Sequence, residues 1–172
     1  QVLHHLAQHS SLKTVDLYPM LRERRKEKLL YYKRDNHWTR YGAFLAANML
    51  LSRIHEDFPA VVPNDPDDYE FQPTKITVGN VADMFGNKEL IIDTVLDFVP
   101  KAGFKAKDAP KVPYEPIEIF PYPWDYEHVR EIGDTSKPKM VLICDSFGHN
   151  IFPYLAEQFH RSVKIFDSWQ FM

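Results

Sequence analysis

Cysteine is nearly absent from this 172-residue chain, in which Cys144 is the only one. Disulfide bonds and zinc sites built from several cysteines are therefore excluded within the chain. The sequence also has no apolar run near the roughly 20 residues that a membrane-spanning helix requires. Basic residues are not in excess either, since the formal net charge is −3. The composition therefore gives no indication of a nucleic-acid partner.

What the sequence does contain is enough apolar material for one folded domain. Hydrophobic residues make up 44% of the chain and aromatic residues 14%, and a chain of this length can bury a sizeable core. The basic segment at residues 21–28 also carries two glutamates, which is typical of a solvated helix face. Because the first residue is Gln rather than Met, we expect a processed or truncated piece of a longer protein.

Regular patterns predict helices and strands in the first and last thirds of the chain. Thr39 is a favourable N-cap for the helix predicted most clearly, at residues 39–54. The apolar run within residues 138–148 predicts a strand buried on both faces, followed by a helix at 150–159 and a strand at 162–168. This order indicates a parallel sheet with flanking helices. Nearer the N-terminus, the patterns predict a helix around residues 2–6, a buried strand at 13–18 and a helix at 19–30.

Residues 59–138 differ from the rest, since they contain eleven of the 13 prolines. Short β-like runs at residues 70–78, 90–99 and 115–122 alternate with turns. We therefore expect a single domain, residues 1–172, with an irregular β-rich insertion at about 59–138. The tips of its loops are polar enough to form a binding surface.

Three polar side chains form a candidate catalytic group. Ser146 follows the predicted strand at its carboxyl end, where active residues of parallel sheets gather. Its backbone N–H opens a helix and is free to stabilise an oxyanion, while its hydroxyl needs a base within hydrogen-bonding reach. His37 is the candidate base. Asp35, two residues before it in an extended segment, points the same way and is the candidate orienting carboxylate.

Each of these pieces also has a plainer interpretation. Asp35 is favourable near any helix start, His37 is one of eight histidines, and an Asp-Ser pair before a helix is a common capping arrangement. His5 and His9 have the i, i+4 spacing of a metal pair, but no carboxylate follows at metalloprotease spacing, which favours a surface helix. His149 is either an accessory donor or an ordinary helix residue, and the second interpretation is favoured.

Several segments resemble blocks of one known family. Residues 31–51, "YYKRDNHWTRYGAFLAANMLL", resemble the family block Y-x-x-D-x-H-W-x-x-x-G. Residues 141–159, "VLICDSFGHNIFPYLAEQF", resemble the block G-D-S-F and the helix after it. Residues 78–86 are similar to a Gly-Asp-Leu-Ala-like segment between the two blocks. The family is that of the alginate O-acetyltransferase-like proteins of the AlgJ/AlgX type and the related DHHW proteins, which are relatives of the SGNH hydrolases.

The resemblance implies an SGNH-like three-layer αβα fold with a parallel sheet, in a fragment lacking edge elements at both ends. By this resemblance, Asp35, His37 and Ser146 match a catalytic triad. Asp145 matches the acid that supports the turn before the helix. Asn80 stands where the family tends to have Asp, and it is a candidate oxyanion donor.

The implied chemistry is acyl transfer. Ser146 would take an acetyl group from an acyl donor, a small molecule or a donor protein, and a sugar hydroxyl or water would accept it. The resemblance thus implies a carbohydrate O-acetyltransferase or acetylesterase. It would act on a cell-surface or exopolysaccharide, in the periplasm or otherwise outside the cytoplasm, and without a metal or organic cofactor. The alternatives are a non-catalytic polysaccharide-binding or assembly module on the same fold, and a general esterase that prefers small acyl groups.

Aromatic residues are candidates for contact with the sugar. They are Trp38, beside the candidate base, and Tyr122 and Trp124 in the aromatic stretch at residues 119–128. Packing is the commoner use of such side chains. Cys144 stands where the family usually has Gly, and we expect it to pack, as buried cysteines often do.

Overall fold

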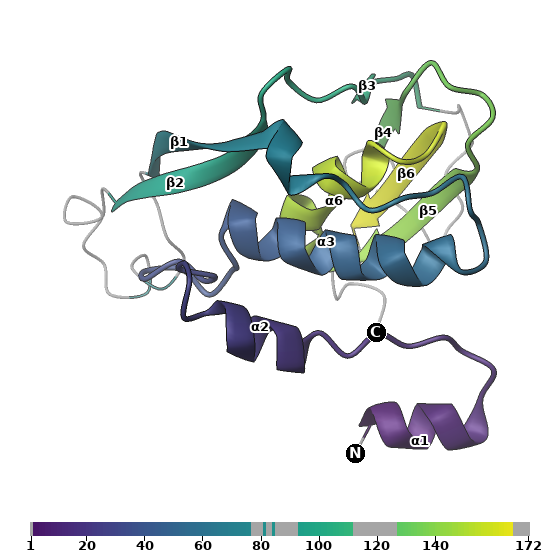
Figure 1. Cartoon of the computed structure of the whole chain (residues 1–172), viewed down its shortest axis with the longest axis horizontal. Helices are drawn as coiled ribbons and strands as arrows, with labels where there is room; N and C mark the ends of the chain where they lie inside the picture. The colour runs from purple at the N-terminus through teal and green to yellow at the C-terminus, as the bar shows by residue number, and fades with distance from the viewer. Residues whose placement is uncertain (1, 77–80, 82–83, 85–92, 112–126, 167–172) are drawn as a thin grey trace.

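The chain folds around two β-sheets and a pair of packed helices (Figure 1). The structure, a computed structural model, describes all residues except 1, 77–80, 82–83, 85–92, 112–126 and 167–172. Its elements, in chain order, are α1 (Val2–His9), α2 (Tyr18–Arg24), α3 (Arg40–His55), a 3-10 turn (Pro66–Asp68), β1 (Tyr69–Ile76), β2 (Asp93–Pro100), β3 (Lys107–Asp108), β4 (Glu127–Glu131), β5 (Lys139–Cys144), α6 (Gly148–Ala156) and β6 (Arg161–Phe166).

The four-stranded sheet has the strand order β3-β4-β6-β5. β5 and β6 are parallel, with α6 as the connection between them, whereas β4 runs antiparallel to β6 and β3 antiparallel to β4. The predicted strand–helix–strand unit is therefore present, but the predicted parallel sheet is a mixed one. β1 and β2 form a separate antiparallel ribbon in register from Tyr69↔Pro100 to Ile76↔Asp93.

α3 is the central helix of the core, and it matches the predicted helix closely. Its N-cap is Thr39, as predicted: the Thr39 hydroxyl accepts a hydrogen bond from the backbone N–H of Gly42 at 3.2 Å. Ala43, Ala46 and Ala47 are fully buried. Small side chains on this face let α3 pack closely against α6, the helix that follows the candidate nucleophile.

A cluster of aromatic rings holds the β1–β2 ribbon against the helix pair. Phe44 of α3 has its ring centroid 4.8 Å from that of Phe98 and 5.5 Å from that of Tyr154, both near perpendicular. The ring of Tyr69 stacks on Phe98 at 5.4 Å, and the buried Tyr154 hydroxyl donates to the Phe98 carbonyl oxygen. Edge-to-face pairs of this kind add to the stabilisation from burial alone. The ribbon is thereby fixed beside α3 and α6.

Two predictions for the N-terminal third are wrong. Residues 13–18 form no strand, because no neighbouring strand pairs with them and most of their side chains are exposed. The helix predicted to reach residue 30 ends at Arg24, and it buries no side chain. Short helices in water depend on packing of an apolar face, so the charged run after Arg24 forms turns instead.

β5 was predicted to be buried on both faces, and this prediction is also wrong. Met140 and Leu142 pack against the core, but Val141 and Ile143 are 65% and 68% exposed. Within the described residues, helices contact only one face of this sheet, and β5 forms its edge. Among all the residues that the structure describes, no helix is long and apolar enough to cross a membrane.

Candidate functional site

The segment before α3 is a small loop that fixes the candidate acid and base. Tyr31 and Trp38 form an isolated antiparallel bridge, and the Tyr32 N–H donates to the carbonyl oxygen of His37 at 3.1 Å. The loop between these residues carries Asp35. The side chains of Asp35 and His37 are therefore held directly at the N-terminal end of α3.

Asp35, His37 and Ser146 form one hydrogen-bonded chain. A single oxygen of Asp35, Oδ1, accepts from the backbone N–H of His37 at 2.8 Å and lies 2.5 Å from its Nδ1. The other ring nitrogen, Nε2, lies 2.7 Å from Ser146 Oγ. The Asp35 and His37 side chains are 17% and 21% exposed, so the three hydrogen-bonded residues are largely shielded from solvent, and all three line one hollow. The structure thus brings together the three residues that the sequence singled out.

The turn after β5 presents Ser146. Asp145 Oδ1 accepts from the backbone N–H of Phe147 at 2.9 Å, and the Asp145 carbonyl accepts from Gly148 N–H at 3.1 Å. In the described part of the chain, no acceptor contacts the backbone N–H of Ser146. That N–H is available to a developing negative charge beside the hydroxyl.

Trp38 and Asn150 join the two blocks that carry the site. The Trp38 indole N–H donates to the Phe147 carbonyl at 3.0 Å, and the Asn150 side-chain amide donates to the Trp38 carbonyl at 3.1 Å. The Trp38 and Phe147 rings meet edge to face at 5.4 Å. Trp38 is only 7% exposed, so little of its surface is open to the sugar contact predicted for it. Sequence reasoning missed Asn150, although its place one turn after Ser146 was a usable signal.

A hollow of about 370 Å³ opens beside Ser146. Two of its walls come from the β1–β2 ribbon, through Thr74 and Asp97, which no motif in the sequence indicated. Burial, together with the Asp97 carboxylate, raises the pKa of Tyr32, so its hydroxyl stays protonated there. Every residue that lines the hollow carries a polar group: Tyr32, Asp35, His37, Arg40, Thr74, Asp97, Ser146, His149 and Asn150.

Cys144 packs beneath the start of α6. A Cβ added at Gly148 would lie 2.1 Å from Cys144 Sγ, so the sulfur occupies the space that the glycine leaves open. Burial raises the pKa of the Cys144 thiol, which keeps it from acting as a thiolate nucleophile. The other predicted site residues, Asn80, Tyr122 and Trp124, lie outside the described residues.

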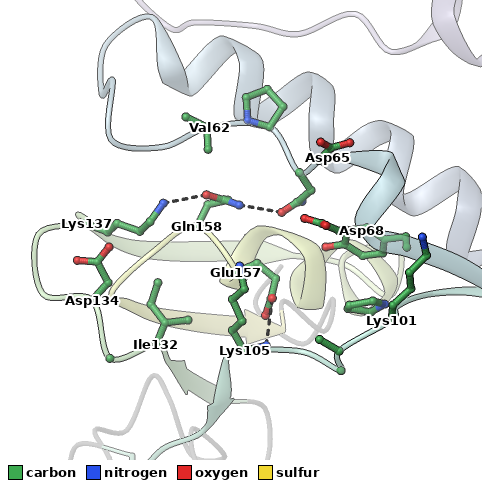
Figure 2. A pocket seen from close by; sticks show the side chains of 17 residues that line it. Val62, Asp65, Asp68, Lys101, Lys105, Ile132, Asp134, Lys137, Glu157 and Gln158 are labelled. Atoms are coloured by element: carbon green, nitrogen blue, oxygen red, sulfur yellow. Dashed lines mark hydrogen bonds between the residues drawn. The ribbon is translucent and has the colours of Figure 1, made fainter.

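A second hollow, of about 710 Å³, lies at the opposite end of α6 and shares no residue with the first (Figure 2). Its polar side chains hold the fold together. Glu157 accepts from the backbone N–H groups of Lys105 and Ala106 at 3.0 and 2.8 Å, and Lys137 donates to the Gln158 side chain at 2.8 Å. On α1, the rings of His5 and His9, for which a surface helix was favoured over a metal pair, lie 4.4 Å apart. The described residues contain no group of three metal ligands.

Comparison with solved structures places this geometry in a known fold. Bacillus cereus PatB1 with a sulfonyl adduct is similar with a TM-score of 0.64 and 19% identity, over 95% of this chain and 62% of that one. A DHHW family protein from Eubacterium siraeum is similar with a TM-score of 0.66 and 17% identity, over 96% of this chain and 61% of that one. The O-acetyltransferase domain of Pseudomonas putida AlgJ is similar with a TM-score of 0.51 and 13% identity, over 95% of this chain and 50% of that one. The chain therefore spans about three fifths of the length of the first two.

At these identities the structural likeness establishes the fold alone, and no protein of curated function matches the sequence significantly. The sequence itself is more informative. Residues 1–167 match the family described as the SGNH hydrolase-like domain of the acetyltransferase AlgX. The SGNH-like fold and the family predicted from the two sequence blocks are confirmed, and the chain belongs to the AlgX-type family of SGNH hydrolase-like acetyltransferase domains.

Proposed function

We propose that this domain is a carbohydrate O-acetyltransferase or acetylesterase that works through an acetylated Ser146. One observation carries the proposal: the hydrogen-bonded chain from Asp35 through His37 to Ser146, with 2.5 Å and 2.7 Å between the joined atoms. Nucleophile, base and orienting carboxylate in this arrangement are the requirements of serine-based acyl transfer. Family membership supports the same reaction class.

In the proposed first step, His37 Nε2 takes the Ser146 proton while Oγ attacks the acyl carbonyl carbon. The carbonyl π electrons move onto its oxygen, which the Ser146 backbone N–H stabilises. The tetrahedral intermediate then collapses, the bond to the leaving group breaks, and His37 returns the proton to that group. Asp35 holds Nδ1–H in place and stabilises the charged imidazole throughout. The product of this step is an acetyl ester on Ser146.

In the second step, an acceptor hydroxyl gives its proton to His37 and attacks the acetyl carbon, and Ser146 leaves with the proton from His37. We propose a hydroxyl of a cell-surface or exopolysaccharide as acceptor, and a location outside the cytoplasm. Asp145 supports the turn, Asn80 is proposed to add an oxyanion donor, and Tyr122 and Trp124 are proposed to contact the sugar. Trp38, which is nearly buried, joins the two blocks of the site instead.

Intact-mass analysis after incubation with an activated acetyl ester tests the proposal. We expect one acetyl adduct, or ester turnover, in the wild type and neither in Ser146→Ala. Ser52→Ala is a matched control, because Ser52 lies on the exposed side of α3 and its hydroxyl bonds only the Asn48 carbonyl. Equal acetylation of wild type and Ser146→Ala would refute the role of Ser146. Glycan binding without any adduct would instead support the non-catalytic module.

The same assay separates transferase from esterase. With a neutral oligosaccharide acceptor present, a transferase gives acetylated sugar at a rate that grows with acceptor concentration. An esterase gives free acetate at a rate that the acceptor does not change. The polar hollow beside Ser146 has room for a small acyl group and one sugar hydroxyl, so we expect transfer to compete with hydrolysis.

A further inference from the structure

A buried lysine next to the site has no role in the mechanism above. Lys164 lies on β6, on the face that α6 covers, and is only 4% exposed. Its ammonium is 5.6 Å from the centroid of the Phe152 ring. Among the described residues, its hydrogen-bond partner is His149 Nδ1, at 2.6 Å. Burying an ammonium group is costly, and a Met of similar length would fill the same space, so packing alone does not account for a lysine here.

The contact with Lys164 fixes the protonation of His149. Burial lowers the pKa of the Lys164 amine from its ordinary value. In its ammonium form Lys164 can only donate, so His149 Nδ1 then accepts through its lone pair, and the single ring proton of the neutral imidazole is on Nε2. Partial burial, the Lys164 charge and the nearby His128 and His37 all lower the pKa of His149, with Asp145 acting in the opposite direction. The imidazole is therefore neutral in the physiological range, with Nε2–H as a donor.

The position of His149 directs this donor to the site. His149 lines the hollow that holds Ser146 and His37, and its Nδ1 edge faces the sheet through Lys164. Because the two ring nitrogens lie on different edges of the imidazole, Nε2–H lies on the edge that does not contact Lys164. In the described part of the chain no acceptor is bonded to it.

We propose that His149 is a further catalytic residue, whose Nε2–H donates to the carbonyl oxygen of the acyl group attacked by Ser146, and that Lys164 is the positioning residue that fixes this tautomer. The inference rests on the proposed function, because it assigns a donor for the oxyanion formed there. The two histidines then have different roles. His37 transfers the proton, while His149, held by Lys164, keeps its Nε2 proton and stabilises the negative charge on the oxyanion.

The first test is the tautomer of His149, which is independent of activity. In protein with ¹⁵N-labelled histidine, the His149 signals are those lost in His149→Gln. We expect the neutral Nε2–H form at pH 7. In Lys164→Met the like charge is gone and Nδ1 loses its donor, so we expect the pKa of His149 to rise and a mixture of tautomers to appear. A wild-type His149 protonated on Nδ1, or a titration unchanged by Lys164→Met, would overturn the inference.

The second test is the rate at which an activated acetyl ester acetylates Ser146, measured at saturating ester. Loss of an oxyanion donor costs on the order of 100- to 1000-fold. Because the Ser146 backbone N–H stays in place as a donor, we expect about 10- to 100-fold in His149→Ala. His149→Gln should keep most of the rate, because the Gln amide reaches the point occupied by Nε2. His128→Ala is the matched control, since His128 pairs with Lys164 across the strands but does not line the hollow.

The outcomes separate this inference from the proposed function. A wild type that is acetylated on Ser146, with His149→Ala reacting equally fast, would overturn the role of His149 and leave the proposed function standing. A wild type without any acetylation would contradict the proposed function, and the tautomer measurement would still decide whether Lys164 fixes His149. A fall in rate with an unchanged melting temperature, reversed by Gln, supports the inference.

Discussion

Gly148→Ala should damage both stability and acetylation, because the strand end leaves no space for a methyl group. The added Cβ would lie 2.1 Å from Cys144 Sγ and 2.4 Å from Cys144 Cβ. Non-bonded atoms of this size prefer separations of roughly 3.5–4.0 Å, so the start of α6 must move by about 1 Å or more. Ser146 lies between the two residues, and its hydroxyl is only 2.7 Å from His37 Nε2.

The size of the effect follows from two opposing contributions. Overpacking costs about 1–3 kcal/mol, while Ala in place of Gly returns at most about 1 kcal/mol in a helix interior and less in the first turn. We therefore expect a net loss of about 1–2 kcal/mol, which lowers the melting temperature by about 2–4 °C per kcal/mol. A displacement of about 1 Å at a reacting group can cost about 100-fold in rate, so acetylation of Ser146 should fall further than stability.

A graded series at Cys144 tests this reasoning. Cys144→Ala in the Gly148→Ala background removes the sulfur but leaves the Cβ contact, and should rescue only in part. Cys144→Gly removes both, and the next atom, Leu142 Cδ2, is 4.0 Å away, so stability and rate should recover. Gly133→Ala is the control, because nothing lies within 4 Å of its added Cβ. Thermal unfolding and acetylation rates that show additive effects at positions 144 and 148 would refute the steric coupling.

Three further changes probe the same region. Trp38→Phe removes the hydrogen bond to the Phe147 carbonyl. We expect the free energy of unfolding, measured with denaturant, to fall by about 1 kcal/mol, and the rate of Ser146 acetylation to fall by a larger proportion. Thr39→Ala removes the N-cap of α3 and its bond to Gly42 N–H, and should cost about 1 kcal/mol, so an unchanged unfolding midpoint would contradict the capping role. Burial raises the pKa of Cys144, so its alkylation by iodoacetamide at pH 8 should be slower than that of a free cysteine and speed up as pH rises.

The sequence predicted the site better than it predicted the sheet, and local chemistry explains why. Asp35 and His37 lie two apart before a capped helix, and both the cap and the pairing depend on neighbours in the chain. The partner of His37, Ser146, is 109 residues away. Chemistry suggested the pairing and the resemblance to a family supported it, but no pattern along the chain could show that the two side chains meet. The bonds that Trp38 and Asn150 make between the blocks had no sequence signal of comparable strength.

The errors share one physical origin, which is that burial depends on distant neighbours. The apolar run of β5 predicts burial on both faces, yet Val141 and Ile143 are exposed because β5 is the edge strand of the described sheet. The antiparallel direction of β4 could not be predicted either, since residues 127–131 pair with residues of β6 that lie 30 to 38 positions further along the chain. Lys164 escaped notice for a related reason, as its burial arises only when α6 packs over β6.

The arrangement of the site also indicates which parts of the fold control it. The sheet contributes Ser146 through a single turn, whereas Asp35 and His37 come from the loop ahead of α3. Their relative position is set by contacts between the starts of α3 and α6, chiefly those of Trp38 with Phe147 and Asn150. Packing between these two helices therefore governs the distance from His37 to Ser146, while the exposed face of β5 can change with little effect on it.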